Sequence, residues 1–182
     1  MKERADAARN RARVLSAAEH LFAERVPVTM EQIAAAAGVG KGTLYRRYPD
    51  VASIAQALLD EHERELQDAL LRGPPPLGPG APPAERLAAF YRAMVELLER
   101  HGHVALAGET GALRYRTGAY AAWAMHVAVL LGDAERSALV DALLAPLAPD
   151  VFAHQRSRGL SVEEIAGGLE ELARRVMGAS RR

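Results

Sequence analysis

Basic and hydroxyl side chains are concentrated in one short segment, which runs from Lys41 to Tyr48 and reads KGTLYRRY. Its two large apolar anchors, Leu44 and Tyr48, lie four positions apart and would therefore share one face of a helix. The remaining side chains must then point outward, and they are Lys41, Thr43, Tyr45, Arg46 and Arg47. Cations, hydroxyl donors and a glycine that permits close backbone approach are what contact with phosphate groups requires. Each arginine taken alone could equally be an ordinary surface cation.

A second short helix is predicted immediately before this segment. Thr29 can cap a helix start, and Gln32 three residues later can complete a capping box, so the helix should begin at Met30. Gly38 can take the left-handed conformation that ends a helix, and a turn of three to four residues then leads into the basic helix. Two short helices joined by a glycine turn, the second one outward-facing and cationic, indicate a helix-turn-helix that binds double-stranded DNA.

The charge of the chain supports a division into two parts. The 182 residues carry no formal net charge, but residues 1–48 hold nine Lys and Arg against five Asp and Glu, while residues 49–182 hold 14 against 18. A basic head joined to an acidic body would be drawn to DNA through the head. The hydrophobic content of 49% is sufficient for a substantial core.

Several classes of site are excluded or disfavoured. The chain has no cysteine, so disulfides, thiol catalysis and cysteine-ligated zinc are ruled out. His101 and His103 lack further ligands at a recognisable spacing and are interpreted as a solvated helix end, so no metal and no cofactor is predicted. No nucleophile–base arrangement is found, and we do not expect an enzyme. The longest nearly apolar run, residues 119–131, is interrupted by His126 and is too short to cross a bilayer, so a cytoplasmic protein is expected.

Helical periodicity extends over the whole chain, and no strand pattern is found, so the predicted fold class is all-α. The first helix is expected from Ala5 to Arg25. Arg9, Arg11 and Arg13 near its start could contact phosphate, with a disordered basic leader as the alternative for Lys2, Arg4 and Arg9. A further helix is expected from Asp50 to about Leu71, and the proline- and glycine-rich residues 72–83 cannot continue it.

The C-terminal half is predicted to contain several more helices. One should run from Ala84 to near Gly102, followed by a shorter segment to Glu109 and a loop to Gly118. A buried helix should then end near Gly132. Ser161, with Glu164 three residues later, predicts a second capping box that opens the final helix.

The N-terminal third of the chain resembles the DNA-binding domain of the TetR family of transcriptional repressors. The resemblance rests on RVLSAAEHLFAER, TMEQIAAAAGVGKGTLYRRY and DVASIAQALLDE, which begin at Arg13, Thr29 and Asp50. It implies a three-helix head at residues 1–49, a connecting helix at 50–72, a linker at 73–83 and a larger helical ligand-binding and dimerisation domain at 84–182. The implied protein is an all-α homodimer.

Carried over by position, the resemblance assigns a specific set of residues to DNA contact: Thr29, Lys41, Gly42, Thr43 and Tyr45, with Arg46 and Arg47 as added cations. Three positions depart from the family pattern. Gly40 stands where serine is frequent, Arg47 replaces a second aromatic residue, and Val51 replaces a lysine. The last change removes a phosphate contact, which Arg47 can restore.

The C-terminal domain offers candidates for a ligand site and for a dimer interface. The candidate ligand-binding residues are Phe90, Tyr91, Met94, Glu109, Trp123 and His126, and ordinary core packing is the alternative for each of them. The segments from Asp133 to Leu147 and from Ser161 to Met177 are expected to form a four-helix interface between two subunits. The alternative is that they pack only on their own body.

The leading hypothesis is a homodimeric repressor that a small-molecule ligand releases from a near-palindromic operator in DNA. A second hypothesis is a helical binding or scaffold protein with a degenerate head, motivated by Val51 and the neutral net charge. A third, an all-helical enzyme, would require turnover that depends on His126 or Glu109.

Overall fold

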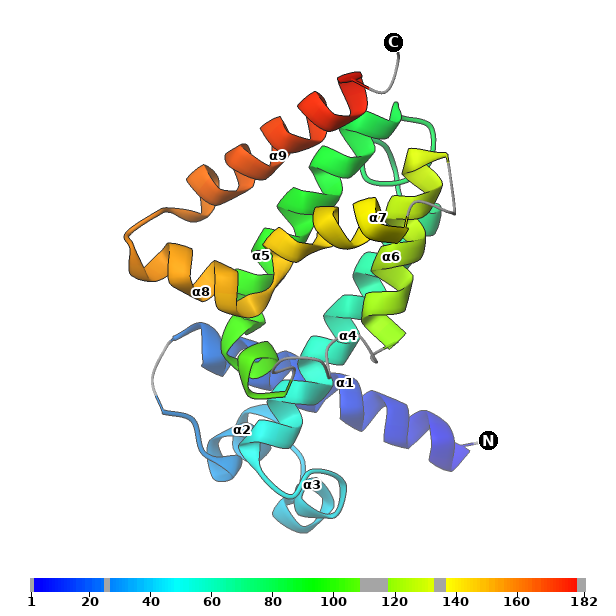
Figure 1. Ribbon diagram of the computed structural model, residues 1–182. Helices are drawn as coiled ribbons and strands as arrows, with labels where there is room; N and C mark the ends of the chain where they lie inside the picture. The colour runs from blue at the N-terminus through cyan, green and yellow to red at the C-terminus, as the bar shows by residue number, and fades with distance from the viewer. Residues whose placement is uncertain (1, 25–26, 109–117, 133–136, 180–182) are drawn as a thin grey trace. The chain divides into compact units, whose positions relative to one another are not determined.

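The computed structural model describes residues 2–24, 27–108, 118–132 and 137–179 (Figure 1). These residues are mostly helical and include no strand, which confirms the all-α fold class. The chain divides into two compact units, Met1–Glu61 and His62–Arg182. The boundary falls within helix α4 (Val51–Arg72), which therefore contributes to both units.

The first unit is a bundle of short helices with its own core. Besides the start of α4, it contains α1 (Lys2–Ala23), α2 (Met30–Ala37) and α3 (Lys41–Arg47). The helix α1 ends two residues before the predicted Arg25, and α3 ends one residue before Tyr48, which is its C-cap. The main residues of this core are Val14, Leu15, Ala18, Met30, Ile33, Ala37, Leu44, Tyr48, Ile54 and Leu58.

The predicted signals at both ends of α2 are confirmed. The Thr29 hydroxyl accepts a hydrogen bond from the Gln32 amide at 3.3 Å, and the Gln32 side-chain oxygen accepts one from the Thr29 amide at 2.8 Å. Gly38 closes the helix with φ of 60°, in the left-handed region. The Arg13 guanidinium donates to the Gly38 carbonyl oxygen at 2.8 Å, which attaches α1 to this turn. The turn is thus held by both local and long-range contacts.

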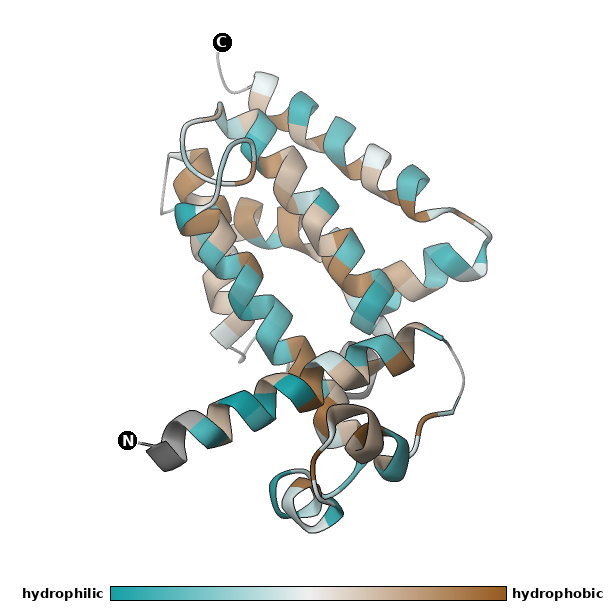
Figure 2. Cartoon of the chain, turned by 180° about the vertical axis from the view of Figure 1, so that it is seen from behind, coloured by the Kyte–Doolittle hydropathy of each residue, from teal (hydrophilic) through white to brown (hydrophobic). Residues whose placement is uncertain are grey.

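The second unit is built around one long helix. Helix α5 packs along α9 and also contacts α8 and α6 (Figure 1). The bounds of the helices in this unit, beyond the end of α4, are α5 Pro83–Gly108, α6 Gly118–Leu131, α7 Ser137–Leu144, the short 3-10 helix η2 Ala145–Leu147, α8 Pro149–Ser157 and α9 Val162–Ala179. Hydrophilic and hydrophobic residues alternate along α9, as its packing on α5 requires (Figure 2). Ile165, Leu169 and Ala173 are buried on its inner side.

The predicted helix end near Gly102 is wrong, because α5 continues without a break to Gly108. Gly102 is buried, and a Cβ atom at this position would lie 3.8 Å from the Phe152 ring of α8. A side chain as small as alanine would therefore be in ordinary van der Waals contact with α8 at this position. A glycine inside a helix lowers its stability by about 1 kcal/mol relative to alanine but does not end it when tertiary packing supports it.

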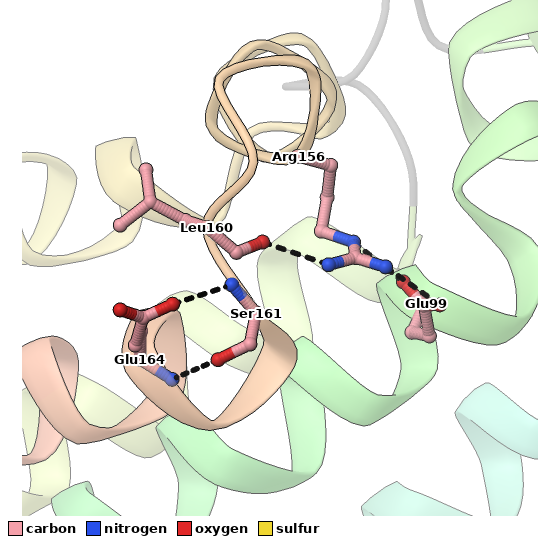
Figure 3. A network of polar contacts seen from close by, with 5 residues as sticks. All are labelled: Glu99, Arg156, Leu160, Ser161 and Glu164. Carbon is pink, nitrogen blue, oxygen red and sulfur yellow. Dashed lines mark hydrogen bonds and ion pairs between the residues drawn. The ribbon is translucent and has the colours of Figure 1, made fainter.

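The corner between α8 and α9 confirms the second capping box (Figure 3). The Ser161 amide donates to the Glu164 carboxylate at 2.7 Å, and the Glu164 amide donates to the Ser161 hydroxyl at 3.1 Å. Arg156 donates to the Leu160 carbonyl oxygen at 2.7 Å and forms an ion pair with Glu99 of α5 at 3.2 Å. These bonds set the direction in which α9 leaves the corner.

Helix α6 is apolar on nearly all sides, and part of it remains exposed. Trp123, Val127 and Leu130 are buried, whereas Met125 and Val129 are 66% and 63% exposed. Across the parts of the chain that the structure describes, none of the helices combines the length and the apolar character that crossing a membrane would need.

Candidate nucleic-acid interface

Helix α3 presents the predicted polar face outward. Leu44 is 1% exposed and Tyr48 6% exposed, so these two residues anchor the helix in the core of the first unit. The six candidate DNA-contacting residues of this segment are all exposed: Lys41, Gly42, Thr43, Tyr45, Arg46 and Arg47. The orientation predicted from the four-residue spacing is therefore confirmed, and their contact with DNA stays a prediction.

The backbone of this segment allows a close approach from outside. A Cβ atom at Gly42 would meet no other atom within 4 Å, so the surface above this glycine is open. Gly40 has φ of −65° and serves as the N-cap of α3 without any side-chain hydrogen bond. A serine, which the resemblance leads one to expect at this position, would be compatible with that backbone conformation. Thr29 is exposed at the start of α2, and its hydroxyl retains its own hydrogen for donation outward.

The side chains of α3 also make contacts within the unit. Arg46 donates to the Thr43 hydroxyl at 3.3 Å, and the Arg47 guanidinium lies 5.8 Å from the centre of the Tyr48 ring. The Tyr45 hydroxyl donates to Glu31 of α2 at 3.3 Å. The pKa of Tyr45 is raised, first by loss of hydration and then by the Glu31 charge and hydrogen bond, so Tyr45 keeps its hydroxyl hydrogen as a donor.

Three arginines of α1 have partners within their own unit. Arg9 pairs with Asp6, Arg11 pairs with Glu61, and Arg13 donates to the Gly38 carbonyl oxygen. Their expected role as phosphate contacts stays a prediction, but each has a partner in the structure. Val51, where the resemblance leads one to expect lysine, is half-buried and packs against the core, so an apolar residue suits this position.

A hollow of about 460 Å³ lies between α1 and α3 in the first unit. Its apolar floor includes Val14 and Leu44, and its lining also includes Arg11, Arg46 and Arg47. The positive side chains thus extend from α3 to this neighbouring hollow. Asp6 also lines the hollow, and Arg11 is paired with Glu61, so Arg46 and Arg47 are the cations of α3 that line it.

The candidate ligand residues of the second unit are brought together in part. The Phe90 ring lies 5.8 Å from Trp123 and 5.2 Å from His126, measured between ring centres. Tyr91 is fully buried and donates to the Leu143 carbonyl oxygen at 2.9 Å, which gives it a structural role. Met94 is also buried. Glu109 lies outside the described residues, as does Asp133 at the start of the predicted dimer segment.

One ring nitrogen of His126, on α6, is buried without a partner. This nitrogen is Nε2, and the Nε atom of Arg86 on α5 is likewise buried without a hydrogen-bond partner. Burial, followed by the positive charge of Arg86, lowers the pKa of His126 to about 4. Arg86 uses another nitrogen to donate to the Leu70 carbonyl oxygen at 3.1 Å. Sequence reasoning missed Arg86, although it lies four positions before Phe90 on the same face of the helix.

The interpretation of His101 as part of a solvated helix end is wrong. His101 is 5% exposed, and its Nε2 atom lies 2.7 Å from Nδ1 of His62, which is 8% exposed. Because α5 continues past Gly102, His101 lies inside a helix rather than at its end. Within the residues that the structure describes, no group of three or more His, Asp or Glu side chains is arranged to hold a metal ion.

Comparisons with known proteins agree with this arrangement. Residues 14–58 match the model of the family described as bacterial regulatory proteins, tetR family. The chain is also similar to a solved structure from Rhodococcus sp., a protein assigned to the TetR-family transcriptional regulators. The TM-score is 0.63 at 20% sequence identity, over 92% of this chain and 98% of that one. No curated protein matches the chain.

Proposed function

Because residues 14–58 match the tetR family of bacterial regulatory proteins, we propose that this chain is a homodimeric transcriptional repressor. In this proposal each subunit places α3 in a major groove of a near-palindromic operator, and a small-molecule ligand releases the dimer. The observation that carries the proposal is the outward face of α3, where cations, hydroxyls and Gly42 are exposed while Leu44 and Tyr48 anchor the helix. A face of this composition can approach phosphates and base edges.

Replacement of Lys41 or Tyr45 by alanine tests the DNA face. Both side chains are exposed, so K41A and Y45A should fold normally and retain their assembly state while their affinity for DNA falls. Binding is measured by fluorescence anisotropy with a labelled duplex over a range of salt concentrations. For K41A, loss of one phosphate contact should reduce the slope of log Kd against log salt by roughly 0.9.

Two outcomes would argue against the proposal. If both variants bind DNA as wild type does, α3 is not the recognition element. If the wild type itself binds no duplex even at low salt, the head is degenerate and the chain is a helical binding or scaffold protein. Circular dichroism of each variant separates a loss of contact from a loss of folding.

The proposed dimer uses residues 133–147 and 161–177. Support comes from α9, where Gly168 is exposed and a Cβ atom there would meet nothing within 4 Å. Glycine in the middle of a helix has an energetic cost of about 1 kcal/mol relative to alanine, and no contact within the subunit offsets it. Close approach of a second subunit at this position would explain why a glycine is present there. Two heads in one dimer would then contact successive major grooves, roughly 34 to 36 Å apart.

The proposed ligand site is the group formed by Phe90, Trp123 and His126 with Arg86. Two buried nitrogens without partners, beside aromatic rings, suit a small aromatic acid whose carboxylate accepts from Arg86 and from His126. The ligand need only favour the released state, since about 1.4 kcal/mol of preference changes operator affinity tenfold. Helix α4, whose residues belong to both units, is the proposed lever.

The ligand proposal is tested by titrating the protein–DNA complex with benzoate and salicylate as probes. Release from DNA by either probe should be lost in R86M and in H126L, while DNA binding without the probe is retained. Release that is equal in the wild type and in both variants would contradict the proposed site.

A further inference from the structure

We propose that Glu31 is a specificity-determining residue of the DNA head, which restrains Lys41 and Tyr45 and weakens sequence-independent binding. This inference rests on the proposed function. Glu31 is on α2, outside the basic helix, and neither the spacing of the cations nor the family resemblance pointed to it. One oxygen of its carboxylate, Oε1, accepts a hydrogen bond from the Tyr45 hydroxyl at 3.3 Å and lies 3.7 Å from Nζ of Lys41.

The geometry follows from the two helices. Lys41 and Tyr45 are four positions apart on α3, so their side chains lie on one face of that helix. Glu31 follows the N-cap Thr29 by two residues, in the first turn of α2, where a negative charge is favourable. The capping box fixes the start of α2, and the contact between α2 and α3 brings this first turn next to Lys41 and Tyr45. The carboxylate is therefore held at the face that would meet DNA.

Electrostatics gives this contact a consequence for binding. All three side chains are exposed, with Lys41 at 66% and Glu31 at 50%, so the pair itself adds little to folding stability. Before Lys41 can neutralise a phosphate, it must exchange its contact with Glu31, and the carboxylate then lies close to the same phosphate. The pair carries no net charge, so the head binds an arbitrary duplex as though it had one cation fewer.

A correct operator can compensate for this loss, whereas a random sequence cannot. Base-edge contacts are made only when the sequence matches, and a carboxylate can itself accept a hydrogen bond from the cytosine amino group in the major groove. A negative charge at the interface thus disfavours binding that depends on phosphate alone. Discrimination improves because non-specific affinity is lowered, which is a general route to specificity.

The test is the substitution Glu31→Gln, with Glu24→Gln as the matched control. The amide introduced by Glu31→Gln retains the size of the side chain and an acceptor for Tyr45 but removes the charge. Glu24 is also an exposed acid of the first unit, on the segment that follows α1, so E24Q changes the net charge equally. The probe is a labelled random-sequence duplex of about 30 base pairs, long enough for two heads that contact major grooves one helical turn apart. Its binding is measured by anisotropy at several salt concentrations.

We expect E31Q to bind this duplex about threefold more tightly than wild type near 0.15 M salt. The slope of log Kd against log salt concentration should be steeper by roughly 0.9, as one additional phosphate contact implies. E24Q should bind as wild type does. In the background of K41A, the gain from E31Q should largely disappear, because the two residues act as a pair. Thermal unfolding should show that all variants are folded.

The outcomes separate this inference from the proposed function. E31Q binding that equals that of E24Q, or a gain that persists in full with K41A, would overturn the role of Glu31 while leaving the DNA-binding function intact. Weaker binding of the random duplex by E31Q would also overturn it, since the charge would then assist non-specific contact. A wild-type protein that binds no duplex at any salt concentration would remove the proposed function and this inference together.

Discussion

Gly38 illustrates how one residue determines the geometry of the first unit. Its φ of 60° lies in the region that side chains other than glycine rarely adopt, and its carbonyl oxygen accepts the hydrogen bond from Arg13. A Cβ atom at this position would lie 2.4 Å from the Arg13 guanidinium. The turn between α2 and α3 therefore depends on glycine for its backbone conformation, and a Cβ atom there would also require the Arg13 side chain to shift.

Gly38→Ala should destabilise the first unit by at least about 1 to 2 kcal/mol, the cost of a left-handed conformation for a residue with a Cβ atom. Displacement of Arg13 would add to this cost. Urea denaturation measures the change in the free energy of unfolding. Gly42→Ala is the control, because Gly42 is helical with open space around it and alanine there should be neutral or stabilising. Equal effects of the two substitutions would contradict the role given to Gly38.

His126 should make the stability of the protein depend on pH. Its pKa is about 4 in the folded protein against 6.5 ordinarily, so the unfolded chain binds more protons between these values. Stability should therefore fall as the pH drops from about 6.5 to 4 and should not fall further through this group below pH 4. His126→Leu should reduce the difference between urea midpoints measured near neutral pH and just above the lowered pKa.

The matched control is His154→Leu, which removes an exposed histidine from the same unit. This variant should keep the wild-type difference between the two midpoints. If H126L retained the full pH dependence, burial of the neutral histidine would not be its source.

At the scale of a single element, α9 shows how a helix start is specified locally. The capping box of Ser161 and Glu164 satisfies amide groups at the first turn, and Arg156 secures the preceding corner (Figure 3). Ser161→Ala should destabilise the second unit by about 1 kcal/mol, as is typical of a lost N-cap. Chemical denaturation measures the loss, and Ser157→Ala, at the end of α8, provides a comparison outside the box.

The capping box also has a pH dependence of known sign. Hydrogen bonds from the Ser161 amide and hydroxyl lower the pKa of Glu164 in the folded protein. The stabilisation is therefore fully present above the ordinary pKa of a glutamate and is lost as the pH falls through the lowered value. Glu164→Gln keeps a side-chain acceptor but should lose the part of the stability that disappears in acid. If the free energy of unfolding of this variant depended on pH as that of the wild type does, Glu164 would not be the source of the effect.

At the scale of the whole molecule, the proposed dimer has two candidate surfaces. The proposed interface includes α9, where Gly168 is exposed, whereas α6 exposes the apolar side chains Met125 and Val129. Substitutions on these two surfaces should differ in their effect on the assembly state. Gly168 has room for a side chain within its own subunit, so a large residue there should leave the subunit folded and act only on assembly.

Gly168→Arg should convert the dimer to a monomer near the chain mass of 19.6 kDa, and light scattering after gel filtration measures the mass. Met125→Arg, on the exposed face of α6, should leave the dimer intact. The reverse pattern would place the interface on α6 and contradict the assignment to residues 133–147 and 161–177. A monomeric wild type would remove the dimer proposal altogether.

What the sequence by itself determined about this protein is mainly local. Both capping boxes, the left-handed Gly38 and the outward face of α3 were predicted correctly, because each depends on residues within about four positions of one another. The all-α class followed from the same periodicity. The resemblance in the N-terminal third also rests on such short patterns, and it agrees with the family match at residues 14–58.

Only the tertiary structure decided the contacts between distant residues. These contacts are those of Arg13 with Gly38, of Glu31 with Lys41 and Tyr45, and of His62 with His101. The structure also shows that α5 continues past Gly102. It also left Nε2 of His126 and Nε of Arg86 buried without a hydrogen-bond partner. The physical reason is that hydrogen bonding, burial and charge at these positions depend on which helices pack together, whereas caps and helix faces depend on short-range spacing.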